Sequence, residues 1–205
     1  MSFYVAENVC ELTQEPGAML NRSSPLRVEV NPWTLDHTLT EVMQLRGAYV
    51  AAIGTVETIL TELAIRASKH QAYAGIRGRF PSRRPERLKY LATVCDTVGP
   101  LTPHRGLILA VMRRFEDGLA LRDIMAHGRM QVLTGPGDDA SIKLEDYSAA
   151  GEFIQFRRDQ YMLKTLRVRV YRTTRLSRSV DSLYFQLGDL LPPVTGEFQG
   201  TNPIA

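Results

Sequence analysis

The chain has 205 residues, of which 44% are hydrophobic and 23% are charged, and this length and composition are typical of one globular domain with a buried core. The formal net charge is only +3, but the cationic side is almost entirely arginine, because only four of the 25 Lys and Arg residues are lysines. Arginine makes bidentate contacts with phosphate, so this bias fits a nucleic-acid partner, with GC-rich codon usage as an equal alternative.

Cysteine and histidine usage argues against a disulfide scaffold and against a metal site. Cys10 and Cys95 lie far apart in the sequence, and the four histidines are scattered without ligand spacing. The N-terminal residues lack the basic start and apolar stretch of a secretory signal, and no apolar run approaches the length that spans a bilayer. We therefore expect a cytoplasmic protein without a metal or an organic cofactor.

The first elements are an N-terminal arm and a long helix. Residues 1–33 contain many Pro, Gly and Ser residues and predict an arm with one short edge strand at 26–30. Apolar residues keep helical spacing over 35–68, which predicts one very long helix, or two if a glycine breaks it. Glu57 lies near its apolar stripe and is expected either to be solvated or to reach the motif described below.

A basic loop and a short helix follow. Residues 72–85 mix glycine and aromatic residues with four arginines, and such a loop is either a solvated connector or an arm that grips phosphate. Its arginines are Arg77, Arg79, Arg83 and Arg84. Pro85 predicts the start of a helix with one apolar stripe at Leu88, Leu91, Ala92, Cys95 and Val98, and Gly99 and Pro100 predict its end.

The second half of the chain predicts two helices, three strands and a last helix. Helices are expected near 103–117 and 119–132, separated at Gly118, and strands at 141–147, 152–157 and 163–171. The last strand would place Arg167 and Arg169 on one face of a small hairpin or meander. A final helix should run from 174 to 191, followed by a disordered tail at 192–205.

The residues that carry chemistry are Arg122, Asp123 and His127, in the sequence Leu-Arg-Asp-Ile-Met-Ala-His-Gly-Arg. On a helix Asp123 and His127 share a face, so the carboxylate is placed to hold the imidazole in one tautomer. Arg122 points roughly 140° away from His127 on an ideal helix. The two converge only if Arg122 lies in a frayed first turn, or if a second copy of the site faces the first.

This arrangement of an arginine, a polar residue and a histidine followed by glycine resembles the R-x4-6-H motif of the HEPN family, over a region from about 35 to 191. The resemblance implies a mainly α fold, an up-and-down helical bundle at 34–191 with a small β hairpin or meander inserted at 141–171 before the last helix. It also implies a metal-independent endoribonuclease whose site forms between two protomers. His127 would be the acid/base, Arg122 the phosphate clamp and Asp123 the orienting residue, while Arg129 and the four loop arginines would contact RNA.

The resemblance further implies a homodimer and a biology of toxins, phage defence or RNA processing, often with an antitoxin or regulatory protein partner. In that chemistry the ribose 2′-hydroxyl attacks its own phosphate and leaves a cyclic phosphate. The competing interpretation is a non-catalytic module that binds nucleic acid, nucleotides or proteins, in which the same three residues have a structural role.

Overall fold

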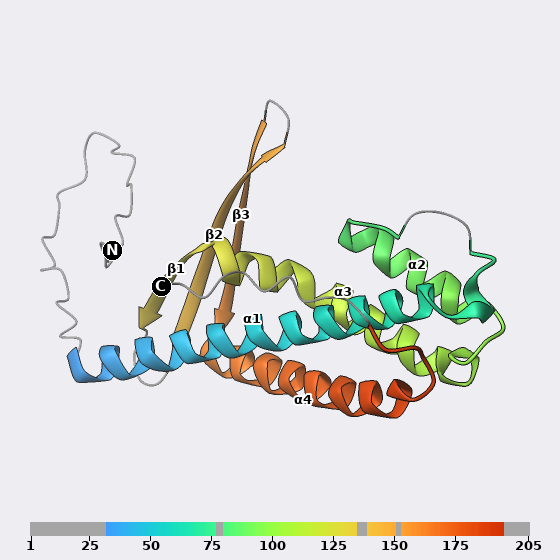
Figure 1. Ribbon diagram of the computed structural model, residues 1–205. Coiled ribbons are helices and arrows are strands. Elements are labelled where there is room, and N and C mark those ends of the chain that lie inside the picture. The colour runs from blue at the N-terminus through green and yellow to red at the C-terminus, as the bar shows by residue number, and fades with distance from the viewer. Residues whose placement is uncertain (1–31, 77–79, 135–138, 151–152, 195–205) are drawn as a thin grey trace, which may run out of the picture.

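The computed structural model describes residues 32–76, 80–134, 139–150 and 153–194. In this part of the chain it is mainly helical, with four α-helices and one three-stranded antiparallel sheet (Figure 1). The predicted arm lies outside the described residues except for Pro32 and Trp33, and so does the predicted tail after residue 194.

Three long helices form the body of the molecule (Figure 1). Helices α1 (Pro32–Ser68) and α4 (Leu163–Gly188) lie side by side and run in the same direction, because Glu41 binds Arg167 near their N-terminal ends and Arg66 binds the Gly188 carbonyl near their C-terminal ends. Helix α3 (Arg105–His127) runs in the opposite direction across α1.

The short helix α2 (Arg84–Asp96) begins beside Glu57 of α1, and the residues just after its end contact Tyr73, beyond the end of α1. It therefore also follows the direction of α1. The helices do not alternate in direction as they would in the predicted up-and-down bundle, since the segment between α1 and α2 carries the chain back before α2 starts.

Helix α1 is continuous through Gly47 and Gly54, as the long run of helical spacing indicated. Residues His37–Ser68 are also long and apolar enough to cross a membrane by length and composition, with a mean hydropathy of 1.4 over the relevant window. This corrects the expectation that no such stretch exists. In this structure 44% of that window is buried by the rest of the protein, and charged residues within the helix bind other elements.

Helix α4 packs its apolar face on α1, and its end is held by a buried arginine. Its buried side chains recur with helical spacing from Leu163 to Leu187. Arg66 of α1, only 7% exposed, donates to the carbonyls of Gly188, Leu191 and Pro192. Those carbonyls lack partners at a helix end, so Arg66 provides the cap that the sequence of α4 does not.

The observed strands include the two predicted at 141–147 and 152–157, with longer bounds, but the remaining strand precedes these two instead of following them at 163–171. The strands are β1 (Arg129–Thr134), β2 (Ala140–Ala150) and β3 (Phe153–Met162), in the order β1-β2-β3. The predicted strand at 163–171 is the first part of α4, so Arg167 and Arg169 lie on a helix. Five alternating residues fit both periods, and burial of Leu163, Leu166 and Val170 selects the helical one.

The expected break at Gly118 is also absent, because α3 runs through it to His127. A Cβ at Gly118 would lie 2.6 Å from the Cδ1 atom of Ile53, so this glycine allows α3 to approach α1 closely. Residues 129–132, expected to be helical, form β1 instead. Arg122 consequently lies well inside a helix and not in a frayed first turn.

The expectations for Val98, just after α2, and for Glu57 of α1 need correction. Val98 does not join the buried stripe of α2 but is 86% exposed, since the helix ends at Asp96. Glu57 neither remains solvated nor reaches the motif: it accepts a hydrogen bond from Nε of Arg84 at 2.9 Å and lies 3.8 Å from Nη2 of Arg87. These contacts join α2 to α1.

Candidate functional site

The motif occupies the last turns of α3, where the chain passes directly into β1. The amide of Gly128 donates to the Ile124 carbonyl at 2.8 Å and closes the helix. A Cβ at Gly128 would overlap that carbonyl oxygen and lie 2.9 Å from the carbonyl oxygen of Glu145 in β2. Glycine after the histidine therefore lets β1 leave the helix along β2, which fixes where His127 is displayed.

Arg122 and Asp123 form a pair on this helix. Nη1 of Arg122 donates to Oδ1 of Asp123 at 2.8 Å, with side-chain exposures of 23% and 46%. Nε of Arg122 is buried and has no hydrogen-bond partner among the described residues. The guanidinium thus keeps unused donor capacity beside a carboxylate that already orients it.

His127 is exposed at the last position of α3. Among the residues that the structure describes, Asp123 binds Arg122 and makes no hydrogen bond to His127. Because α3 is regular, Arg122 and His127 point in directions roughly 140° apart. One chain does not bring the arginine and the histidine onto a common substrate atom.

Arg46 of α1 binds the end of α3, a role that was not predicted from the sequence. Its Nε donates to the Met125 carbonyl, and its Nη2 donates to the carbonyls of Ala126 at 3.2 Å and Gly128 at 3.5 Å. These groups flank His127 and would otherwise lack partners at the helix end. The acceptors are backbone atoms about eighty residues away, so no motif announces the contact.

Two more arginines lie close to the motif. Arg157 of β3 donates from Nη1 to the Ala120 carbonyl of α3 at 2.8 Å and also pairs with Asp159. Arg129, predicted to contact RNA, is exposed at the start of β1, two residues after His127. Arg129 therefore lies beside the end of α3, whereas Arg157 contacts the helix about two turns earlier and is neutralised by Asp159.

The two described loop arginines that were predicted to contact RNA, Arg83 and Arg84, do not lie at this site. Arg77 and Arg79 lie outside the described residues, Arg83 is exposed at the start of α2, and Arg84 pairs with Glu57. Glu57 is eleven positions along α1 from Arg46, which corresponds to roughly 16 Å of helix. The structure therefore separates Arg83 and Arg84 from His127.

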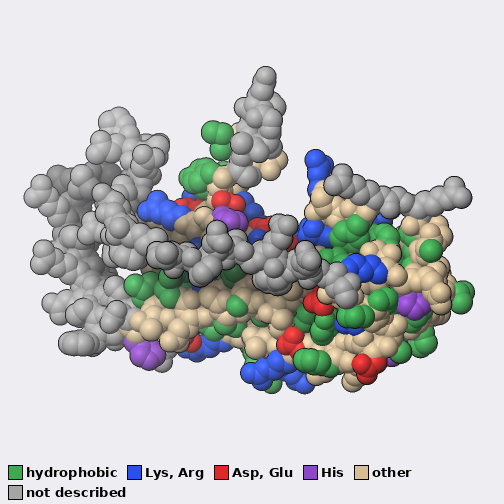
Figure 2. All heavy atoms as spheres, in the orientation of Figure 1, with side chains coloured by type: hydrophobic (Ala, Val, Ile, Leu, Met, Phe, Trp, Pro, Cys, Tyr) green, Lys and Arg blue, Asp and Glu red, His purple; other side chains and the backbone are tan. Residues whose placement is uncertain are grey.

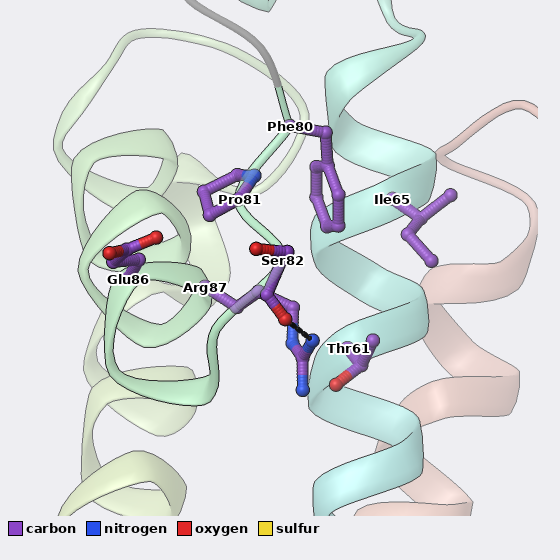
Figure 3. Close-up of a pocket in the computed structure, with 7 residues that line it drawn as sticks. All are labelled: Thr61, Ile65, Phe80, Pro81, Ser82, Glu86 and Arg87. Carbon is purple, nitrogen blue, oxygen red and sulfur yellow. Dashed lines mark hydrogen bonds between the residues drawn. The ribbon is translucent and has the colours of Figure 1, made fainter.

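A cavity of about 600 Å³ lies between α1 and the start of α2, away from the motif. It is lined by Thr61, Ile65, Phe80, Pro81, Ser82, Glu86 and Arg87 (Figure 3). Arg87 donates to the Ser82 carbonyl, and its Nε is buried without a partner in the described part of the chain. None of the predicted catalytic residues reaches this cavity.

Within the described residues, no three His, Cys, Asp or Glu side chains cluster as metal ligands. No family model, curated protein or solved structure matches the chain. The functional assignment therefore depends on the chemistry of the residues at the end of α3.

Proposed function

We propose that this protein is a metal-independent endoribonuclease whose active site forms between two copies of the chain. The observation that carries the proposal is the display of His127: it is exposed at the end of α3, held by the contacts of Arg46, and flanked by Arg129. The Arg122-Asp123 pair lies on the same helix but points elsewhere. The likeness of the motif to that of the HEPN family supports the same assignment, and the mainly helical fold with its small antiparallel sheet is compatible with it.

The proposed reaction needs proton transfer and charge stabilisation, which an imidazole and a guanidinium supply. His127 takes the proton of the ribose 2′-hydroxyl, whose oxygen attacks phosphorus and forms the cyclic phosphate. The bond from phosphorus to the 5′-oxygen breaks, and that leaving oxygen receives the proton from the imidazolium of His127, which returns to its neutral form. Arg122 of the facing copy stabilises the negative phosphate, and Asp123 orients that guanidinium.

The geometry of α3 supports the two-copy arrangement. His127 and Arg122 of one chain diverge around the helix, whereas a two-fold axis beside the helix end would allow His127 of each copy to meet Arg122 of the other. The proposal therefore includes an RNA substrate and a homodimer. A cytoplasmic location and control by an antitoxin or regulatory protein belong to the same proposal.

A second candidate is a nucleic-acid-binding module without catalysis, and the charge of α4 favours it. This helix contains six of the 25 cationic residues of the chain but one of its 22 acidic residues, so it carries +5 and the rest of the chain −2. Arg172, Arg175 and Arg178 are exposed along it. Such a stripe fits a phosphate backbone whether or not His127 cleaves it.

The test is cleavage of RNA by purified protein in EDTA, with His127→Ala and Arg122→Ala. Their matched controls are His104→Ala and Arg114→Ala, near the start and middle of the same helix. We expect cleavage by the wild type, a loss of at least about 100-fold in each motif variant, and unchanged rates in the controls. A wild type that binds RNA but cleaves none, or equal rates in all five proteins, would favour the binding module.

A further inference from the structure

The β2–β3 hairpin projects away from the helices (Figure 1). One of its faces carries exposed aromatic side chains. Tyr147 is 67% exposed and Phe156 46% exposed, and these residues are register partners across the two strands. Their ring centroids are 4.9 Å apart with planes inclined by 39°. Ile154, 78% exposed, extends the same face toward the tip. Hydrophobic side chains are visible on this projecting part in Figure 2.

The same face is cationic. Arg129, Glu145 and Arg158 are register partners across the three strands, and the guanidinium of Arg158 lies 5.1 Å from the centre of the Phe156 ring. Lys143 and Arg158 both bind the Glu145 carboxylate, at 2.8 and 3.0 Å. The hydrogen bond from Lys143 is the main cause that lowers the pKa of Glu145. Three cations against one carboxylate leave this face with an excess of two positive charges.

This face is continuous with the candidate active site. Arg129 is two residues after His127, and from it the register leads across Glu145 to Arg158 and then outward to the aromatic pair. The opposite face of β2 is different, because Ile142 and Leu144 are fully buried against the bundle. On the side with the aromatic residues, Tyr147, Phe156, Arg129 and Arg158 are exposed, whereas Ser141 and Glu145 of the same face are buried.

We propose that this face binds single-stranded RNA, with bases stacking on Tyr147 and Phe156 and phosphates held by Arg129 and Arg158. The inference rests on the proposed function and names its substrate class, RNA with unpaired bases near the cut. Aromatic rings accept any base by stacking, and the adjacent cations attract the backbone. Bases within a duplex are already stacked on one another and have no face to offer.

The test measures binding in a His127→Ala background, so that the RNA stays intact and the result does not depend on cleavage. The probe is a fluorescent oligoadenylate, compared by anisotropy with an abasic sugar-phosphate chain of equal length. The variant Tyr147→Leu/Phe156→Leu removes both rings, and the exchange Tyr147→Phe/Phe156→Tyr keeps them. Phe185→Leu is the matched control, because Phe185 is 76% exposed on α4.

We expect the double leucine variant to bind oligoadenylate about tenfold more weakly, while the exchange and Phe185→Leu bind like the parent. The abasic chain should bind all four proteins alike. Arg158→Gln should lower the salt dependence of binding, which the leucine changes leave unaltered. If the double leucine variant binds oligoadenylate as tightly as the parent, the proposal is overturned. It is also overturned if this variant changes from a dimer to a monomer, because a second copy of the chain then covers this face.

The outcome is separable from that of the proposed function. If the wild type cleaves RNA but loss of the rings changes neither affinity nor cleavage, the stacking face is wrong and the ribonuclease stands. If the rings are needed for binding but the wild type cleaves nothing, the stacking face stands and the protein is a binding module.

Discussion

Single residues at the join of α3 and β1 determine how the motif is displayed. Gly128 is required because a side chain there meets two backbone oxygens, and backbone cannot move aside as a flexible side chain does. Its backbone φ of −71° is ordinary, so the requirement is for space and not for an unusual conformation. The position of His127 depends on this contact between the helix end and the sheet.

We predict that Gly128→Ala destabilises the fold by about 1–3 kcal/mol, through the overlap with Ile124 and Glu145. The matched change Gly47→Ala, where a Cβ meets nothing within 4 Å inside α1, should stabilise the protein by about 0.5–1 kcal/mol. Urea denaturation of both variants checks the pair. A Gly128→Ala protein as stable as the wild type would show that the carbonyl oxygens of Ile124 and Glu145 do not exclude a side chain at this position.

The buried thiol of Cys95 predicts a pH dependence of protein stability. Burial raises the pKa of its thiol to about 11, whereas an unfolded thiol has a pKa of about 8.5. The folded state therefore holds the proton more tightly, and its contribution to stability is complete below about pH 8.5 and is lost as the pH rises toward 11. Several buried tyrosines add to the same trend, so only a difference between variants isolates the thiol.

The free energy of unfolding of the wild type should fall more steeply between about pH 8.5 and 11 than that of Cys95→Ala. The difference should reach at most about 3 kcal/mol at the upper end of the range. Denaturation series at several pH values measure both slopes. Parallel curves would mean that the thiol ionises as easily in the folded protein as in the unfolded chain.

Among the helices and strands, regular apolar spacing predicted the long helices well. It did not distinguish short strands from short helical segments, and it did not predict polar contacts between residues distant in sequence. The helical spacing of α1 continues for more than thirty residues and leaves no competing period. The five alternating residues around Val168 fit a strand equally well, and Gly118 reads as a break until α1 is packed against it. The motif of Arg122, Asp123 and His127 could be recognised because its residues are close in sequence. Arg46 was missed because it binds backbone carbonyls that are distant in sequence.

The contact between α1 and α3 through Arg46 allows a prediction of protein stability. Arg46→Ala should cost about 1–3 kcal/mol, because partly buried carbonyls at the end of α3 lose a charged donor. Arg46→Lys should restore only part of this, since one ammonium does not span all three acceptors. In the control Arg105→Ala, an exposed pair with Asp96 is lost and the change should stay below about 1 kcal/mol.

Amide hydrogen exchange of the same variants measures the effect at the end of α3. Arg46→Ala should increase exchange of the amides in the last turn of α3, which includes Gly128, more than Arg105→Ala does. An Arg46→Ala protein with unchanged stability and unchanged exchange at that turn would remove Arg46 from the support of His127.

At the scale of the whole molecule, the account requires two copies. The regular course of α3 keeps Arg122 and His127 of one chain apart. The exposed Arg129 and Arg158 and the aromatic pair form the neighbouring surface on which we propose that RNA binds. We predict a dimer in sedimentation at micromolar protein, with His127→Ala and Arg122→Ala equally dimeric because neither removes a core contact. A monomeric wild type at that concentration would contradict the composite site.

RNA cleavage in EDTA by a mixture of the two inactive variants, His127→Ala and Arg122→Ala, measured after exchange of subunits, tests whether two copies share one active site. A mixed dimer then has one site with an intact histidine from one copy and an intact arginine from the other. Mixing should restore about a quarter of wild-type activity, since about half of the dimers are mixed and each has one intact site. Mixtures that exchange subunits but remain as inactive as the separate variants would contradict a site shared between two copies.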